Sequence, residues 1–318
     1  MKISLIVPCR NERQHIREFL NNVAAFEIPP NSILELLIAD GSSTDGTREL
    51  LKESSVRVID NPEQIASTGL NRAIAIATGE VIIRLDVHAS YAPDYVVQCL
   101  NVLKASGADN VGGPAQTTAH SYMQQAIAAA YNSPYACGGA RFHDVNYEGS
   151  VDTVTFGCWR RDLFDRIGLF DETLVRNQDD EHNLRITLSG GKIFQSPRIR
   201  CWYEPRGSLR NLFSQYYQYG YWKVRVIKKH GRPAALRQLV PATFAGTEIL
   251  LAIAGLFNTW AVKLLALTTV AYAVFLIAAS LRICLPRKIK LLPVMPIVLA
   301  TYHLSYGLGF LIALVRNR

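Results

Sequence analysis

The chain has 318 residues, 49% of them hydrophobic, and carries a formal net charge of +8. This length allows a full globular domain together with further segments. The apolar residues gather after about residue 239, and many basic residues lie beside them, which favours a membrane protein over a nucleic-acid-binding one.

The first part of the chain alternates apolar runs with helical patterns. Residues 3–7 form a short apolar run that Pro8 stops, and apolar residues then recur at helical spacing over residues 16–23. A second run covers residues 34–39, and residues 66–77 have the composition of a helix. The alternation predicts an α/β fold with a mostly parallel, right-handed wound sheet.

Three predicted strands end in an acid, at Asp40, Asp60 and Asp86. Carboxylates gathered at one sheet edge repel one another unless a cation or donor lies between them, which favours a binding crevice there. Asp86 and His88 can together reach one hard cation that holds a diphosphate. A lone Asp-x-His more often caps a turn. Glycine fingerprints of dinucleotide and P-loop folds are absent from the sequence.

Three motifs, at residues 4–12, 38–47 and 77–88, resemble in order and spacing those of the family 2 glycosyltransferases. These are inverting nucleotide-sugar enzymes with the GT-A fold. Within the family, the chain is most similar to the succinoglycan-type glucosyltransferases, membrane-anchored enzymes that extend lipid-linked sugars. The resemblance implies a Rossmann-like GT-A catalytic domain followed by transmembrane helices.

The resemblance also implies a nucleotide site. Asp40 would accept a hydrogen bond from the uracil ring of a UDP-sugar, and the helix that carries Arg72 would approach the nucleotide. The base and ribose would be lined by Pro8, Arg10 and Glu12.

The resemblance assigns a divalent cation, Mn²⁺ or Mg²⁺, to Asp86 and His88, where it would bridge the diphosphate. Relatives carry a second aspartate at the position of His88. A neutral imidazole adds no charge and suits manganese better than magnesium, so we expect a preference for Mn²⁺.

Residues 177–185 are similar to the family's Glu-Asp motif, whose aspartate is the general base. Counting back from Arg185 gives this role to Asp179, with Asp180 as the alternative and Gln178 in place of the usual glutamate. One base suffices for inversion, because the diphosphate leaves from the opposite face of the anomeric carbon. An acidic helix start that the helix dipole stabilises would explain the same residues without chemistry.

Two further segments are expected on the acceptor side. Residues 156–161 are similar to the family's acceptor loop, in which Gly157 and Trp159 would face the substrate, although Trp159 would as often simply pack in the core. An aromatic-rich helix over residues 215–223 resembles the Gln-x-x-Arg-Trp helix of processive synthases but lacks its arginine. It is equally typical of a membrane-interface belt. Its acceptor candidates are Gln215, Trp222 and Lys223.

The pattern predicts a catalytic domain over residues 1–235 and a membrane domain over residues 236–318. Apolar helices are expected at about residues 239–260, 264–284 and 291–315. Glu248 is costly in lipid, so the first helix spans the bilayer, lies in the interface or re-enters.

Basic residues flank these helices, and positive loops mark the cytoplasmic side. No signal peptide is evident. We therefore expect a multi-pass protein of a bacterial-type inner (plasma) membrane, with its catalytic domain in the cytoplasm and its C-terminus outside, although Arg316 and Arg318 weaken the last step. The collar before the first helix and the loop between the last two contain Lys223, Arg225, Lys228, Lys229, Arg232 and Arg237, and Arg282, Arg287, Lys288 and Lys290.

The predicted function is inverting transfer of a hexose, with glucose favoured, from a UDP-sugar to a lipid-linked saccharide in exopolysaccharide or cell-surface glycan synthesis. Three alternatives stay open. The enzyme transfers directly to a polyprenyl phosphate, or it is a processive polysaccharide synthase, or it is a catalytically silent nucleotide-sugar-binding membrane protein.

Overall fold

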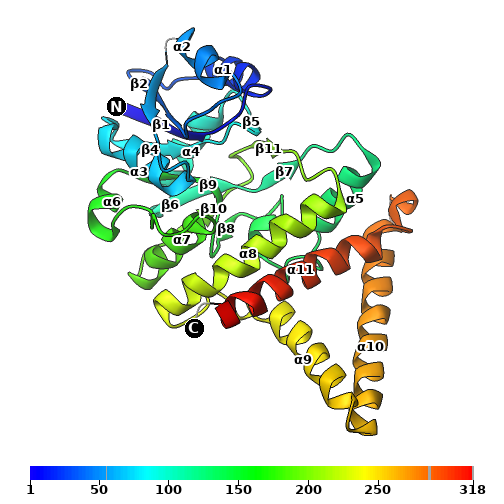
Figure 1. Ribbon diagram of the computed structural model, residues 1–318. Helices are drawn as coiled ribbons and strands as arrows, with labels where there is room; N and C mark the ends of the chain where they lie inside the picture. The colour runs from blue at the N-terminus through cyan, green and yellow to red at the C-terminus, as the bar shows by residue number, and fades with distance from the viewer. Residues whose placement is uncertain (55, 286–287, 317–318) are drawn as a thin grey trace. The chain divides into compact units, whose positions relative to one another are not determined.

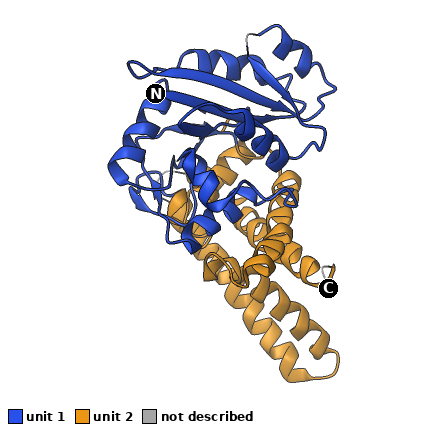
Figure 2. Ribbon diagram, turned by 90° about the vertical axis from the view of Figure 1, so that its left-hand side faces the viewer, with its two compact units in different colours: residues 1–117, 144–204 blue, residues 118–143, 205–318 orange. Residues whose placement is uncertain are grey.

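The computed structural model describes residues 1–54, 56–285 and 288–316, so Arg287 and Arg318 lie outside the described residues. Contacts divide the chain into two compact units (Figure 2). Unit 1 comprises Met1–Thr117 and Asp144–Glu204, and unit 2 comprises residues 118–143 and 205–318. The C-terminal segment of unit 2 thus begins at residue 205, whereas the membrane domain was expected to begin at residue 236. That membrane boundary stays a prediction.

The main sheet of unit 1 has the strand order β3-β2-β1-β4-β9-β6-β10-β8 (Figure 1). Strands β3, β2, β1 and β4 run parallel to one another, and β9 enters antiparallel between β4 and β6. The strands are β1 (Lys2–Cys9), β2 (Ile33–Asp40), β3 (Arg57–Asp60), β4 (Val81–Arg84), β6 (Asn110–Gly113), β8 (Gly149–Ser150), β9 (Thr155–Arg160) and β10 (Ile193–Gln195). A smaller sheet has the order β5 (Ala89–Tyr91), β11 (Cys201–Tyr203) and β7 (Ala115–Thr117).

Side chains of the central strands alternate between two hydrophobic cores. Along β4, Ile83 packs in one core and Ile82 in the other, as the period of two in a strand requires. The first core contains residues of α1 (Ile16–Ala24), α2 (Thr47–Lys52) and α4 (Tyr95–Ser106), and the second those of α3 (Ala66–Ile76), α6 (Asp162–Ile167) and α7 (Gln178–Leu188). Helices therefore cover both faces of the sheet, and the predicted α/β class is confirmed.

Unit 2 is helical. Its most extensive helix–helix contact is between α8 (Leu209–His230) and α11 (Met295–Arg316). Their backbones touch at glycines. A Cβ atom on Gly220 would lie 2.0 Å from the carbonyl oxygen of Tyr306, and one on Gly309 would lie 2.0 Å from that of Tyr217. Small residues permit this close approach. The other helices are α5 (Tyr122–Tyr131), α9 (Val240–Gly255) and α10 (Thr259–Cys284), with short 3₁₀ turns at Arg141–His143, Leu236–Gln238 and Ile289–Leu291.

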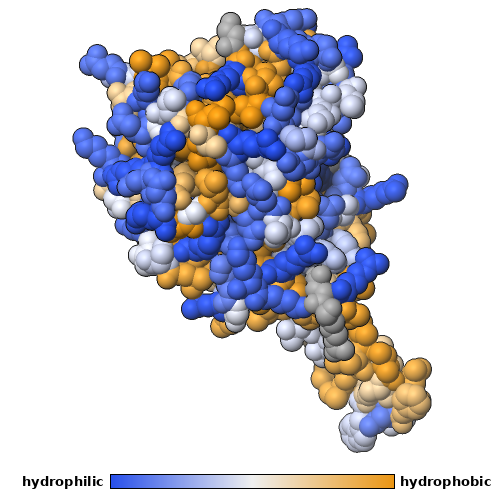
Figure 3. Space-filling model, turned by 60° about the vertical axis from the view of Figure 1, so that its left-hand side comes forward, coloured by the Kyte–Doolittle hydropathy of each residue, from blue (hydrophilic) through white to orange (hydrophobic). Residues whose placement is uncertain are grey.

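Three helical segments of the described chain are long and apolar enough to cross a membrane, at Leu236–Gly255, Thr259–Cys284 and Met295–Arg316. The first two are only 11% and 17% buried, and Figure 3 shows an apolar surface on the hairpin that they form. Within this hairpin, the hydroxyl of Thr269 donates a hydrogen bond to Glu248 Oε2 at 2.7 Å. The pair lowers the cost of placing that glutamate in an apolar helix.

Candidate active site

The carboxyl ends of the parallel strands place several acids along one edge of the main sheet. Asp40, the last residue of β2, pairs in register with Cys9 of β1 and with Asp60 of β3. Asp86 follows two residues after the end of β4. This edge is where open α/β sheets bind ligands.

A cation of the chain itself relieves the repulsion between two of these acids. Arg48 of α2 places Nη1 3.4 Å from Asp40 Oδ2 and pairs through Nη2 with Asp60 Oδ1. Asp40 is fully buried, and its Oδ1 also accepts a hydrogen bond from the hydroxyl of Ser43. These carboxylates therefore need no ligand to coexist, and the predicted contact of Asp40 with uracil stays a prediction.

The loop after β4 is held by Asp86 and Tyr91. Asp86 Oδ1 accepts a hydrogen bond from the backbone N–H of His88 at 3.0 Å, and the backbone N–H of Asp86 donates to the hydroxyl of Tyr91 at 2.7 Å. Burial raises the pKa of Tyr91 well above its usual value, so this hydroxyl stays protonated. Asp86 thus caps the turn, as the structural alternative expected, and its role toward a metal stays a prediction.

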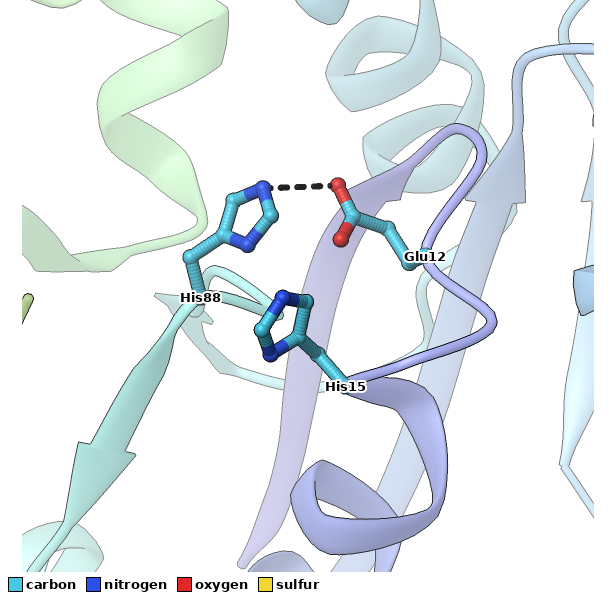
Figure 4. A group of neighbouring side chains, drawn as sticks. All are labelled: Glu12, His15 and His88. Carbon is cyan, nitrogen blue, oxygen red and sulfur yellow. Dashed lines mark ion pairs between the residues drawn. The ribbon is translucent and has the colours of Figure 1, made fainter. Parts of the chain in front are cut away.

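The imidazole of His88 meets two side chains from the loop after β1. Its Nε2 lies 2.9 Å from Glu12 Oε1, and its ring packs edge-on against His15 with 4.9 Å between ring centroids. Figure 4 shows the three side chains converging, Glu12 from the loop before α1, His15 from the start of that helix and His88 from the opposite loop. Glu12 was expected to contact the nucleotide, and His15 was not predicted as a site residue, because nothing in the local pattern links residue 15 to residue 88.

Asp179 lies in the first turn of α7 and faces a buried arginine. Its Oδ2 lies 3.6 Å from Nη1 of Arg84, the last residue of β4, and its Oδ1 accepts the backbone N–H of Asp180 at 2.9 Å. The Asp179 side chain is 42% exposed, whereas that of Arg84 is 9% exposed. Arg84 was not predicted as a site residue, although a charged residue inside an apolar strand is itself a signal of a buried ion pair or a site.

Buried amides fix α7 against the sheet. Asn183 of α7 accepts a hydrogen bond from Nδ2 of Asn110 on β6 at 2.8 Å and donates one to the hydroxyl of Thr153 at 2.8 Å. Asn110 Oδ1 in turn accepts the backbone N–H of Cys158 on β9 at 3.2 Å. A fully hydrogen-bonded buried network makes a core rigid, because breaking it would leave buried polar groups unpaired. This network therefore holds α7, whose first turn contains Asp179, against the sheet.

Gly157 and Trp159 serve the packing of β9. Gly157 has φ of +112°, and a Cβ there would lie 2.4 Å from the indole ring of Trp159, so glycine is required. The ring is 2% exposed and contacts Phe164 and Phe170 edge-on. A ring so buried offers no face to a sugar, and the structure therefore favours the packing alternative for Trp159.

Comparison with known proteins identifies the family. Residues 4–168 match the model of glycosyl transferase family 2. The chain belongs to this family. It is 30% identical to the succinoglycan biosynthesis protein ExoA of Rhizobium meliloti (strain 1021), over 96% of this chain and 93% of that protein. The resemblance drawn from the motifs is thus confirmed.

Two further relatives span most of this glycosyltransferase. A Methanococcus voltae protein, named dolichyl N-acetyl-alpha-D-glucosaminyl phosphate 3-beta-D-2,3-diacetamido-2,3-dideoxy-beta-D-glucuronosyltransferase, is 24% identical over 99% of this chain and 98% of its own. The mannosyltransferase PcManGT from Pyrobaculum calidifontis, solved in complex with GDP-Man and Mn²⁺, superposes with a TM-score of 0.60, at 18% identity over 96% of this chain and 86% of its own. This likeness confirms the GT-A fold.

Of the remaining nucleotide candidates of this glycosyltransferase, Pro8 and Arg10 lie near the same edge, whereas Arg72 lies on the surface of α3. Pro8 pairs with Ala39 within the sheet, and Arg10 is exposed beside Gly41. Arg72 forms a surface ion pair with Glu63 at 2.7 Å. Their roles toward a nucleotide stay predictions.

The acceptor candidates of unit 2 share helix α8. Gln215 Nε2 donates a hydrogen bond to the hydroxyl of Tyr219 at 3.1 Å, and the guanidinium of Arg225 lies 4.6 Å from the Trp222 ring centroid. Lys223 is buried, with 7% of its surface exposed. An indole paired with a cation suits both a membrane interface and an acceptor site, so both alternatives stay open.

Proposed function

We propose that this family 2 glycosyltransferase transfers a hexose, with glucose favoured, from a UDP-sugar to a lipid-linked saccharide with inversion at the anomeric carbon. Family membership supports the transferase activity. The similarity over nearly the whole chain to a succinoglycan biosynthesis protein supports a product in exopolysaccharide or cell-surface glycan synthesis. The Methanococcus voltae relative, whose name gives a dolichyl-linked sugar as acceptor, supports the lipid-linked acceptor.

The observation that carries the mechanism is the accessible carboxylate of Asp179, held 3.6 Å from the Arg84 guanidinium at the carboxyl edge of β4. In the proposed reaction, Asp179 accepts the proton of the acceptor hydroxyl as that oxygen forms its bond to the anomeric carbon. The bond to the diphosphate breaks on the opposite face, and UDP leaves. Asp180 is the weaker candidate, because its Oδ2 is buried.

A divalent cation fits the donor set near the end of β4. The carboxylate of Asp86 is a hard oxygen ligand, and the imidazole of His88 suits Mn²⁺ better than Mg²⁺. When bound, such a cation stabilises negative charge on the leaving diphosphate. Asp86 and His88 would hold it, and we expect turnover to be faster with Mn²⁺ than with Mg²⁺.

The three apolar helices support a membrane location. We further propose a multi-pass arrangement in a bacterial-type inner membrane, with the catalytic domain on the cytoplasmic side, where the lipid-linked acceptor is reached. The basic residues that precede α9 support this orientation, since positive segments stay inside. Cysteine labelling of the loop between α9 and α10 in intact cells tests it, and a loop that is labelled only after lysis contradicts it.

The decisive experiment measures UDP release from a panel of UDP-sugars by membranes that contain the protein, with Mn²⁺ and a lipid extract as acceptor source. Wild type is compared with Asp179→Asn, and Asp180→Asn is the matched control. We expect wild type to release UDP from one of the UDP-sugars. In Asp179→Asn the rate of this release should fall by about 10²- to 10⁴-fold, because the general base is removed. UDP affinity should be unchanged.

Ordinary turnover by Asp179→Asn, with loss in Asp180→Asn, would move the base to Asp180. A product on polyprenyl phosphate that forms equally well in both variants would instead support direct transfer to a phosphate acceptor, which needs no base. A long product chain would support a processive synthase. Nucleotide-sugar binding without release from any donor and extract would support a silent binding protein.

A further inference from the structure

Glu12, His15 and His88 bring one ligand atom each to a common point. These atoms all lie within 4.8 Å of one another. The backbone holds Glu12 and His15 in one turn, since the carbonyl oxygen of Glu12 accepts hydrogen bonds at 2.9 Å from the N–H groups of His15 and Ile16, which begins α1. The loop after β4 supplies the third.

A second observation at Glu12 points to a cation site. Its Oε1 lies 2.9 Å from His88 Nε2, but its Oε2 is buried and receives no hydrogen bond from any described residue. A buried carboxylate oxygen without a donor costs free energy, and coordination of a cation would offset that cost.

We propose that Glu12, His15 and His88 form a binding site for a borderline divalent transition metal such as Zn²⁺ or Co²⁺. Two imidazoles and one carboxylate are a ligand set that zinc uses when a fourth position stays open to water or a substrate oxygen. Tetrahedral bonds of about 2.1 Å place ligand atoms roughly 3.4 Å apart, so only small side-chain rotations separate the present geometry from a closed site.

This site differs from the cation proposed to hold the diphosphate. Asp86 is not among its ligands, and three protein side chains bind without help from a nucleotide. Its nitrogen-rich donor set disfavours Mg²⁺, which prefers oxygen ligands and retains water. Both sites use His88, so the two ions compete for its imidazole, and an ion held by Glu12, His15 and His88 is expected when no nucleotide is bound.

The metal would tie together two loops at the carboxyl edge of the sheet. One loop joins β1 to α1 and carries the predicted nucleotide contacts Arg10 and Glu12, and the other follows β4. An ion that binds only the folded chain also stabilises it by mass action. The site therefore has two readouts, metal affinity and thermal stability, and neither depends on the transfer reaction.

The test titrates Co²⁺ alone, without nucleotide, into the purified full chain in detergent after chelator treatment, and follows visible d–d absorption. We expect one Co²⁺ per chain, displaced by Zn²⁺ but not by excess Mg²⁺, and a Zn²⁺-dependent rise in Tm. His15→Ala and Glu12→Gln should each weaken affinity by about 100-fold or more, since loss of a ligand costs more than loss of a residue that only hydrogen-bonds to a ligand.

Asp86→Asn is the matched control, because it removes the carboxylate proposed to bind the diphosphate cation. This variant should retain Co²⁺ binding and the Zn²⁺-dependent rise in Tm. Metal-free Tm values and far-UV spectra show whether each variant folds. The proposal is overturned if wild type does not bind micromolar Co²⁺. It is also overturned if Asp86→Asn loses binding while folded His15→Ala retains it, which would place the ion at Asp86 and His88.

Discussion

Nη1 of Arg84 and Oδ2 of Asp179 lie 3.6 Å apart, although 94 residues separate them in the chain. The arginine ends β4 and is almost fully buried, whereas the aspartate lies in the first turn of α7 and is partly exposed. The buried guanidinium attracts the accessible carboxylate by its charge, across a distance too long for a hydrogen bond. This pair connects the centre of the sheet to the proposed general base.

Replacement of Arg84 should slow the reaction through the orientation of Asp179. We expect Arg84→Met to lower kcat by about 10- to 100-fold, because misplacing a catalytic group by about 1 Å costs up to about 10²-fold. Steady-state kinetics with UDP binding and Tm measured alongside separates this effect from unfolding. Arg17→Met is the control, since Arg17 pairs only at the surface with Glu53 at 3.9 Å. A folded Arg84→Met enzyme with wild-type kcat would remove Arg84 from the mechanism.

Trp159 should matter to stability and not to acceptor binding. Trp159→Leu removes a 2%-exposed ring from contact with Phe164 and Phe170, and we expect it to cost about 2–3 kcal/mol of unfolding free energy. Denaturant unfolding of the solubilised protein measures this, with Trp260→Leu, at a 69%-exposed position, as the control. A raised acceptor KM with unchanged stability would instead support sugar stacking.

His182 should make the protein sensitive to acid. Burial, with a smaller contribution from Arg185, lowers the pKa of His182 from 6.5 to about 4. Between these values the unfolded chain binds a proton that the folded chain does not. The contribution of neutral His182 to the unfolding free energy is therefore present in full above about pH 6.5. It is lost as the pH falls through about 4, and the total loss is up to about 3 kcal/mol.

His182→Phe should remove this dependence, because a phenyl ring suits the site beside Phe164 and Phe170 and takes up no proton. The measurement is the unfolding free energy of both proteins between pH 7 and pH 4.5. The variant should lose less stability than wild type over this interval. Equal losses would show that other groups cause the acid sensitivity.

The contact between α8 and α11 should depend on glycine. Gly309→Ala places a Cβ 2.0 Å from the carbonyl oxygen of Tyr217, so we expect a loss of about 1–3 kcal/mol, seen as a lower Tm in detergent. Gly246→Ala is the matched control, because the nearest atom there is 3.5 Å away and alanine favours the helix. Equal Tm values for both variants would contradict the close packing.

Local patterns were sufficient to predict the elements of this glycosyltransferase. The apolar run that opens the chain and the run that ends at Asp40 correspond to β1 and β2, and the alanine-rich segment after Asp60 corresponds to α3. The three apolar segments near the C-terminus correspond to α9, α10 and α11 within a few residues. These features depend on side-chain periodicity and turn residues over short distances, which a sequence displays directly.

The sequence by itself determined the family, the α/β class and the apolar helices, because ordered motifs and local periodicity carry that information. Only the tertiary structure decided that Arg48 neutralises Asp40, that Trp159 is a core residue, that Arg84 faces Asp179 and that His15 joins Glu12 and His88. Each of these contacts depends on strand order and on the directions in which loops leave the sheet. Those are set by the packing of the whole domain, since no local pattern specifies which distant side chains will meet.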